Sequence, residues 1–357
     1  MKVLFLSVTV GAGHNVVANN IKSYFEKNGH QTYLIDIFEK NKNIQHTISG
    51  YGFKAMYKLP KIANYFYYRC KTSNHTYFEK IINFAKERVI RLINDFQPDI
   101  IVSSHIAGLL ITQKFRKEIN KPFKNCFFVT DYDNTPSLFN DDNKDYIIVP
   151  NDDFRNELLE RGFSKERVFA FGIPINEVFF EKKDKNEIIK KHFCNFDTSK
   201  KTILFMGGGK GLGNIYKNIK YIDKNSNHQI IVVCGKNKKL KNRIDKLKSS
   251  KIFSFGFVNF VDELMEVSDF IFGKTGGLSS TEALAKNLSI ISFDNIPCPE
   301  QANLKYFVSK NVAIEIKRRK EFLLSLEKNY IIDNSDIIKQ NTAQNVYNLL
   351  VKDNKIE

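Results

Sequence analysis

The stretch Gly273–Phe307 constrains the fold most, because it follows one buried strand and contains a second, and each strand ends where a helix begins. The first strand, Phe270–Phe272, turns through Gly276-Gly277 into a helix that begins at Ser279–Glu282. The second strand, Leu288–Phe293, ends at Pro297–Gln301, where another helix starts. In an open parallel sheet, ligands lie outside the carboxyl ends of the strands. A helix N-terminus offers free N–H groups and partial positive charge, which suit phosphate. The stretch therefore predicts a nucleotide site in an α/β domain.

The strength of such a site has to come from several groups acting together. A helix dipole contributes roughly 0.3–1 kcal/mol, whereas micromolar binding of a nucleotide takes about 8 kcal/mol. Glu282, one turn into the first helix, is placed to accept hydrogen bonds from ribose hydroxyls. The side chains that could bind the hydroxyls of a sugar are Glu300, Gln301 and Asn303. The alternative makes Glu282 an ordinary first-turn carboxylate and Gly276-Gly277 a tight turn, but together these features favour a site.

A strand, a turn and a helix also open the chain. Val3–Thr9 is typical of a buried parallel strand, and it leads into Gly11–His14 and a helix from Asn15. Val16 stands where a dinucleotide-binding fingerprint has its third glycine, so a dehydrogenase is not favoured. The histidine of this turn could take a proton from a hydroxyl group, because its pKa lies near neutrality. A capping or solvent-exposed histidine is the alternative.

The same pattern restarts in the second half of the chain. The strand Thr202–Met206 leads into Gly207–Gly213, which lacks the Gly-Lys-Ser/Thr of a Walker loop. A glycine-rich turn still lets the backbone approach a diphosphate closely. The donor contacts expected here are Gly208, Gly209 and Lys210. Gly235, which follows the strand Ile230–Val233, is assigned to the same donor site.

The length, charge and cysteine content of the chain limit its domain number, its partners and its cellular compartment. The 357 residues are enough for two domains. A formal net charge of +16 predicts an anionic partner: nucleic acid, acidic lipid or a nucleotide. The five cysteines show no paired spacing, which argues against disulfides or a zinc site and fits a reducing cytosol. The apolar run Met1–Val10 leads into a glycine turn rather than a cleavage site, and no segment approaches the ~20 apolar residues of a spanning helix.

Lys274 to Asn303 closely resembles the donor-binding segment of processive diacylglycerol glucosyltransferases and the related monogalactosyldiacylglycerol synthases. Their pattern reads Lys-Pro-Gly-Gly-(Ile/Leu)-Thr-x-x-Glu-Ala, then Pro-Gly-Gln-Glu and an asparagine. Thr275 replaces the first proline here, and Cys298-Pro299 replaces the Gly-Gln before Glu300. The donor contacts expected in this segment are Gly276, Gly277, Leu278, Ser279, Ser280, Glu282, Glu300, Gln301 and Asn303. The resemblance covers most of the chain, including Gly11–His14, Thr130–Tyr132 and Gly172–Ile175.

The resemblance implies the GT-B fold, in which two doubly wound Rossmann-like domains face each other across a cleft. Strand–helix alternation independently supports two such halves. By resemblance, residues 1–175 form an acceptor and membrane-facing domain, residues 176–335 bind the UDP-sugar, and a helix in 336–357 crosses back to the first domain. The same resemblance makes His14 the catalytic base and has the backbone at Phe257 and Val258 contact the uracil base.

Asp131-Tyr132-Asp133 spells Asp-x-Asp, the metal-binding signature of the other common glycosyltransferase architecture. There a divalent cation bridges the carboxylates and the diphosphate. The phosphate-type glycine turns of this chain lie in its other half, so we expect no metal ion and no cofactor. The family has Thr-Asp-(Phe/Tyr) at this place, which implies that Asp131 lines the acceptor cleft or orients His14. His105, which follows another buried strand, is a further candidate site member, with a structural role as the alternative.

Residues 51–71 alternate aromatic and basic side chains without an acidic residue. Such a segment can enter lipid headgroups, bind nucleic acid, or pack as a helical pair with its lysines in solvent. Because the acceptor implied by the resemblance is a lipid, we favour contact with an anionic membrane. The residues expected there are Tyr57, Tyr65, Phe66, Tyr67, Tyr68 and Arg69.

The resemblance implies transfer of glucose or galactose from a UDP-hexose to diacylglycerol with inversion, by a cytoplasmic protein peripheral on the inner face of the cell membrane. Two alternatives share the architecture: an N-acetylglucosaminyltransferase acting on a polyprenyl-linked precursor, and a sugar-nucleotide epimerase that needs no lipid. A nucleic-acid-binding protein is not favoured, because no helix-turn-helix, zinc or ribonucleoprotein signature occurs.

Overall fold

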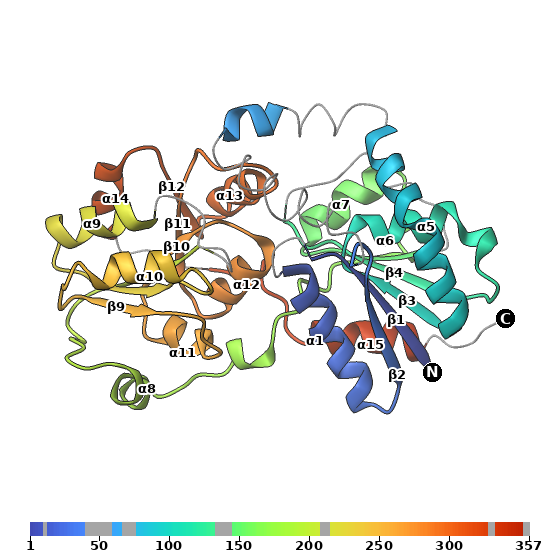
Figure 1. Cartoon of the computed structure of the whole chain (residues 1–357), viewed down its shortest axis with the longest axis horizontal. Coiled ribbons are helices and arrows are strands. Elements are labelled where there is room, and N and C mark those ends of the chain that lie inside the picture. Colours follow the sequence, from blue (N-terminus) through green and yellow to red (C-terminus); the bar gives the residue numbers. More distant parts are fainter. Residues whose placement is uncertain are drawn as a thin grey trace. The chain divides into compact units, whose positions relative to one another are not determined.

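The computed structural model describes residues 1–9, 13–39, 59–65, 76–132, 145–207, 215–327 and 333–352. The chain divides into two compact units (Figure 1). Unit 1 consists mostly of residues up to Asn176, together with the segment that begins at Asp336. Unit 2 consists mostly of the continuous run Glu177–Ser335. Among the helices in these ranges, none is both long and apolar enough to cross a membrane.

Unit 1 is built on a parallel sheet with strand order β2-β1-β3-β4-β5-β6. Leu4 and Leu6 pack with α5 and α6 on one face of the sheet, whereas Phe5 points to the other face and contacts Phe25 of α1. The sheet is therefore doubly wound, as alternation along β1 requires. The strands are β1 (Lys2–Ser7), β2 (Gln31–Asp36), β3 (Ile100–Ser103), β4 (Lys124–Phe128), β5 (Asp145–Ile148) and β6 (Val168–Phe169). The α-helices are α1 (Gly13–Lys27), α5 (Thr76–Phe96), α6 (Ile106–Lys114), α7 (Asp152–Glu160) and α15 (Thr342–Lys352).

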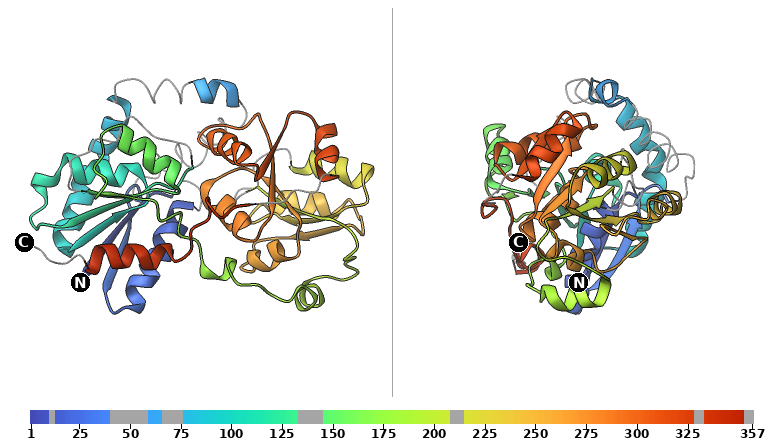
Figure 2. Two further views of the ribbon diagram at one scale, coloured as in Figure 1. Left: turned by 180° about the vertical axis from the view of Figure 1, so that it is seen from behind. Right: turned by 90° about the vertical axis from the view of Figure 1, so that its left-hand side faces the viewer.

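Helix α15, the last helix of the chain, packs on α1 in unit 1 (Figure 2, left). The ring of Tyr347 lies 5.3 Å from that of Phe25, and its hydroxyl group lies 3.3 Å from Nε2 of His30. The start of the helix is fastened as well, since Thr342 Oγ1 donates to the carbonyl oxygen of Phe171 at 2.6 Å. The neighbouring Gly172 has φ +89°, and a Cβ there would lie 2.9 Å from Cβ of Lys339, so the close approach requires glycine.

Unit 2 repeats this architecture with strand order β12-β11-β10-β7-β8-β9, again fully parallel. Its core joins residues of β7, β8 and β10 to α9 and α14. Gly273, at the end of β10, pairs with Met206; a Cβ on it would lie too close to the Met206 carbonyl oxygen. The strands are β7 (Thr202–Met206), β8 (Gln229–Val233), β9 (Ile252–Phe255), β10 (Phe270–Gly273), β11 (Ser289–Phe293) and β12 (Ala313–Ile316). The α-helices are α8 (Lys185–His192), α9 (Ile215–Asn225), α10 (Lys238–Asp245), α11 (Val261–Glu266), α12 (Gly277–Ala285), α13 (Glu300–Ser309) and α14 (Arg319–Leu326).

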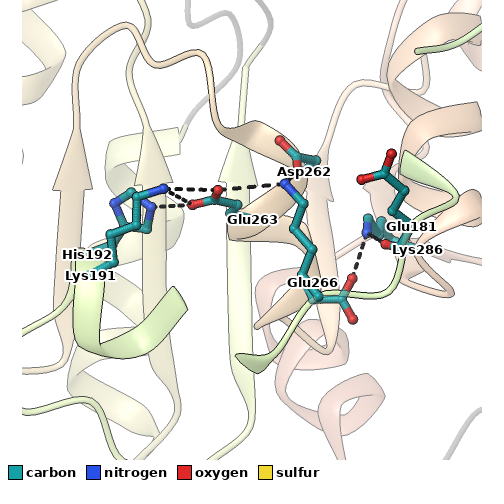
Figure 3. Close-up of polar contacts among 8 residues, drawn as sticks. Glu181, Lys191, His192, Asp262, Glu263, Glu266 and Lys286 are labelled. Carbon is teal, nitrogen blue, oxygen red and sulfur yellow. Dashed lines mark hydrogen bonds and ion pairs between the residues drawn. The ribbon is translucent and has the colours of Figure 1, made fainter. Parts of the chain in front are cut away.

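Ion pairs fasten the beginning of unit 2 to α11 and to the end of α12 (Figure 3). Glu263 accepts from His192 at 2.5 Å and from Lys191 at 3.1 Å. Lys183 Nζ lies 2.6 Å from Oδ2 of the buried Asp262. Lys286, whose side chain is only 3% exposed, lies 2.6 Å from Glu266 and also donates to the Glu181 carbonyl oxygen. Because several of these charges are buried, the contacts are costly to break singly.

Candidate functional site

His14 lies in the first turn of α1, where the structure brings it beside the ends of β3 and β4. Its Nδ1 lies 2.7 Å from the carbonyl oxygen of Ser104 and 3.3 Å from Oγ1 of Thr130. A carbonyl oxygen can only accept, so Nδ1 of His14 carries the proton of this hydrogen bond. In the neutral imidazole the lone pair then belongs to Nε2. The backbone of β3 thus selects the tautomer that a general base needs.

His105 packs against His14, and the two imidazole centroids are 4.9 Å apart with an interplanar angle of 87°. His105 is the N-cap of α6, where its Nδ1 accepts from the backbone N–H of Ala107 at 3.2 Å. Burial lowers the pKa of His105 to about 3, and the positive charge of a protonated His14 acts in the same direction. His105 is therefore neutral at physiological pH. We refer to His14, Ser104, His105 and Thr130 as the base cluster.

A series of side-chain hydrogen bonds connects the base cluster to the ends of the neighbouring strands. Ser104 Oγ donates to Ser7 Oγ at 3.0 Å, and Ser7 Oγ donates to Asn15 Oδ1 at 2.6 Å. The Asn15 amide in turn donates to Thr9 Oγ1 at 2.9 Å, and Thr9 Oγ1 donates to Asp36. These bonds join the ends of β1, β2 and β3 to the first turn of α1. Sequence reasoning missed Ser7, Asn15 and Ser104, since only the strand order brings them together.

Asp131 follows β4 directly after Thr130 and is half-buried. Its predicted neighbour in the Asp-x-Asp motif, Asp133, lies outside the described residues. Within the part of the chain that the structure describes, no three His, Cys, Asp or Glu side chains are grouped closely enough to hold a metal ion. The roles assigned to Asp131, and the absence of a metal requirement, stay predictions.

In unit 2, the turn after β10 is fastened to the first turn of α13. Lys274 Nζ lies 2.6 Å from Oε1 of Glu300. Thr275 Oγ1 donates to the Glu300 carbonyl oxygen at 2.6 Å, and the Asn303 amide donates to the Thr275 carbonyl oxygen at 2.9 Å. We refer to Lys274, Thr275, Glu300 and Asn303 as the donor turn. Two segments that are far apart in the sequence thus form one rigid surface at the carboxyl ends of β10 and β11.

The carboxyl groups near the donor turn are held in a poorly solvated environment. Oε2 of Glu300 is buried and has no hydrogen-bond partner among the described residues. Burial raises the pKa of Glu300 to about 8, while the Lys274 ammonium beside it acts in the opposite direction. Burial also raises the pKa of Glu282 to about 8. A displaced pKa of this kind is typical of functional sites, although structural ion pairs also produce it.

The structure gives two of the predicted sugar-binding residues internal contacts. Asn303 is fully buried and fastens the donor turn, as described above. The Gln301 amide donates to the Asp294 carbonyl oxygen at 3.0 Å. Direct contact of Asn303 or Gln301 with a sugar stays a prediction; in this geometry both side chains shape the surface on which a ligand would lie.

Helix α12 begins two residues earlier than the sequence indicated, at Gly277, with Gly276 as its N-cap. Leu278 and Ser279 are half-buried in its first turn, and Ser280 is buried. A small pocket lies at this helix start, and the polar groups that line it come from both sides of the turn. Its lining includes Met206, Gly273, Lys274, Ser279 and Ser280.

The strands β8 and β9 end beside each other. The N–H of Gly235 donates to the Gly256 carbonyl oxygen at 3.1 Å, and Gly235 has φ +55°. Phe257 is 74% exposed, and Val258 beside it is half-buried. Contact of the Phe257 and Val258 backbone with the uracil base stays a prediction.

Several predicted residues cannot be placed. The donor residues Gly208, Gly209 and Lys210 lie outside the described residues, as do Tyr57, Phe66, Tyr67, Tyr68 and Arg69 of the aromatic and basic segment. The structure does describe residues 59–65, in which residues 60–65 are helical. Leu59, Ile62 and Tyr65 there are 59%, 52% and 59% exposed.

The protein was compared with known families, sequences and structures. The family model for monogalactosyldiacylglycerol (MGDG) synthase matches residues 14–175. Two relatives, the processive diacylglycerol beta-glucosyltransferases of Bacillus licheniformis and Bacillus subtilis, are each 28% identical to the chain. The matches cover 91% of this chain and 85% and 86% of the respective relatives.

Solved structures show the same fold at much lower identity. MurG of Acinetobacter baumannii has a TM-score of 0.57 at 12% identity, with 99% of both chains covered. The UDP-GlcNAc 2-epimerase of Neisseria meningitidis, solved with UDP-GlcNAc bound, also has a TM-score of 0.57, at 16% identity, with 99% of this chain and 100% of that chain covered. The predicted GT-B fold and the predicted family resemblance are both confirmed. This chain is a sugar-transferring enzyme with the GT-B fold, similar in sequence to the processive diacylglycerol glucosyltransferases and, over residues 14–175, to the monogalactosyldiacylglycerol synthase family model.

Proposed function

We propose that the protein transfers a hexose, glucose or galactose, from a UDP-sugar to the free hydroxyl group of diacylglycerol, with inversion at the anomeric carbon. The observation that carries this proposal is the 28% identity along 91% of the chain to relatives named for diacylglycerol glucosylation. The base cluster and the donor turn supply the two kinds of chemistry that such a transfer needs.

In the proposed reaction, Nε2 of His14 accepts the proton of the acceptor hydroxyl group while the hydroxyl oxygen attacks the anomeric carbon. The new carbon–oxygen bond forms on the face opposite the bond to the diphosphate, which breaks and releases UDP. A single displacement of this kind inverts the configuration. General-base assistance is typically worth about 10²–10⁴-fold in rate, and the Ser104 carbonyl supports it by stabilising the imidazolium that forms.

The donor is proposed to lie along the carboxyl ends of the unit 2 strands. The turns at Gly277, where α12 begins, and at Gly209 would stabilise the diphosphate. Glu282 would hydrogen-bond the ribose, and Glu300 is the group of the donor turn best suited to a sugar hydroxyl, because its Oε2 has no hydrogen-bond partner among the described residues. No metal ion is proposed, and full activity in excess chelator is the expected result.

We also propose that the protein works at an anionic membrane surface on the cytoplasmic side. The exposed Ile62 and Tyr65, three residues apart in a short helix, and the exposed Leu59 just before it bring apolar groups together at the surface. Basic residues of the same segment would attract acidic headgroups. Flotation with anionic vesicles tests this: the triple change Phe66→Ser, Tyr67→Ser and Tyr68→Ser should weaken binding, and unchanged binding would remove the segment from the proposal.

The decisive experiment offers the purified protein UDP-glucose, UDP-galactose and UDP-N-acetylglucosamine with diacylglycerol vesicles, and separates the lipid products by chromatography. A hexosyl diacylglycerol formed from one UDP-hexose is the expected result. Transfer only from UDP-N-acetylglucosamine to a polyprenyl-linked acceptor would identify the first alternative. Conversion of the sugar nucleotide without any lipid would identify an epimerase.

A further inference from the structure

The proposed reaction uses only one of the two imidazoles in the base cluster, and the second has no assigned task. His105 follows β3, and its ring meets that of His14 nearly at right angles with 4.9 Å between centroids. Edge-to-face pairs of aromatic rings are favourable at this distance and fix the relative ring orientation. His105 therefore restricts rotation of the His14 side chain.

His105 is itself held in place independently of His14. Its Nδ1 accepts from the Ala107 N–H at 3.2 Å, and its backbone has the extended conformation of an N-cap, with φ −139° and ψ 142°. Because the His105 ring is fixed in this way, it can limit rotation of the neighbouring His14 ring. It also stays neutral, so it does not oppose the positive charge that His14 acquires when it takes a proton.

We propose that His105 is a positioning residue for His14: its fixed ring holds the imidazole of His14 in the orientation in which Nδ1–H reaches the Ser104 carbonyl and Nε2 is offered to the acceptor hydroxyl group. This inference rests on the proposed function, because it assigns His105 a role in the same step. Without the His105 ring, the His14 ring could rotate away from Ser104. The hydrogen bond that selects the Nδ1–H tautomer of His14 would then be lost.

Two variants separate this role from simple helix capping. His105→Asn keeps an N-cap acceptor for the Ala107 N–H but removes the ring. His105→Phe keeps a ring at the same place but removes the acceptor. If His105 positions His14, His105→Asn should lower kcat roughly 10–100-fold with little change in the KM for the UDP-sugar, because misplacing a catalytic group by about 1 Å can cost that much. His105→Phe should keep kcat within a few-fold of wild type while lowering the melting temperature.

The inference is overturned if His105→Asn has the kcat of the wild type, or if His105→Phe loses as much activity as His105→Asn. The first outcome would reduce His105 to a cap. The second would mean that its nitrogen atoms, rather than the ring, are required.

A spectroscopic measurement decides the question without any assay of sugar transfer. The ring nitrogens of His14 in ¹⁵N-histidine-labelled protein, assigned by their loss in His14→Gln, report the tautomer directly. We expect a single Nδ1–H tautomer in the wild type and in His105→Phe, and a mixture in His105→Asn. An unchanged tautomer in His105→Asn would overturn the positioning role even if the enzyme proves to glycosylate diacylglycerol. The expected spectra would uphold it even if the acceptor proves to be another hydroxyl compound.

Discussion

The base cluster and the donor turn occupy equivalent places in their units, at the carboxyl ends of parallel strands, yet they are held together by different forces. In the base cluster, neutral groups and a backbone carbonyl fix the position of His14. In the donor turn, a buried ion pair between Lys274 and Glu300 joins two segments. The first arrangement selects a tautomer and the second holds charge in a place where water is scarce.

This difference separates the expected consequences of mutation. Removing a neutral group from the base cluster should affect the reaction more than the fold, because no charge is left unpaired. Removing one member of the donor-turn ion pair leaves a buried charge, so stability should suffer before any effect on binding is seen. Five predictions test the distinction, beginning with the largest expected effect.

His14→Ala should lower kcat about 10²–10⁴-fold, the usual worth of a general base. The affinity for UDP should stay near that of the wild type, because the nucleotide is expected on unit 2. Steady-state kinetics and calorimetry with UDP would measure the two quantities. His228→Gln, a change at the amino end of β8, is the matched control and should leave kcat unchanged; a fully active His14→Ala enzyme would exclude the base assignment.

Lys274→Met should lower the free energy of unfolding by about 3–5 kcal/mol when the Glu300 carboxylate stays ionised. The loss should be larger at pH 9 than at pH 6, because burial raises the pKa of Glu300 to about 8 and the carboxyl group can take up a proton in acid. Urea unfolding at both pH values tests this. Lys305→Met, at an exposed position of α13, is the control.

A double-mutant cycle sharpens the same comparison. Adding Glu300→Gln to Lys274→Met should recover part of the lost stability, because it removes the unpaired charge. Strictly additive losses in the double variant would show that the pair is not coupled, and the contrast between the two clusters would fail.

Above pH 8, where Glu282 is ionised, Glu282→Ala should weaken UDP binding by about 1.5–3 kcal/mol, the range for a hydrogen bond to a charged group. Calorimetry with UDP alone is the appropriate measurement, since it does not depend on turnover. Unchanged affinity would show that the ribose does not lie at Glu282.

Glu282→Gln should have the smallest effect, a change in how stability depends on pH. Because burial raises the folded-state pKa of Glu282 to about 8, the native state binds a proton more tightly than the unfolded state, and this group makes the protein less stable as pH rises from about 4.5 to 8. The neutral glutamine removes that loss, so the variant should gain stability relative to wild type at pH 8.5 and little at pH 5. Glu160→Gln, at an exposed position, should show no such trend.

The sequence predicted the architecture because alternation of buried strands and helices is a local pattern. The strands at Phe270 and Leu288, and the helices after them, appear within two residues of their predicted starts. The motifs also indicated which strand ends carry polar groups. The two doubly wound halves were therefore visible without knowledge of any long-range contact.

The contacts inside each cluster were not visible, because they join residues that only the strand order brings together. His14 meets Ser104 ninety positions along the chain because β1 lies next to β3 in the sheet. Lys274 meets Glu300 because β10 lies next to β11. Asn303 was predicted to face a sugar from the motif alone, and its burial depends on how α13 packs. The residue types indicated what kind of chemistry each site could perform. The strand order determined which residues contact one another.

The return of α15 to unit 1 has a consequence for the order in which the protein is completed during translation. Unit 2 has almost its whole sequence once Ser335 has left the ribosome, whereas unit 1 still lacks the helix whose Tyr347 covers Phe25 and His30. Unit 1 is thus synthesised first but receives its last helix only after unit 2 has been synthesised. Until then Phe25 and His30 lack their contacts with Tyr347, and apolar surface that is exposed in this way during synthesis is where chaperones act.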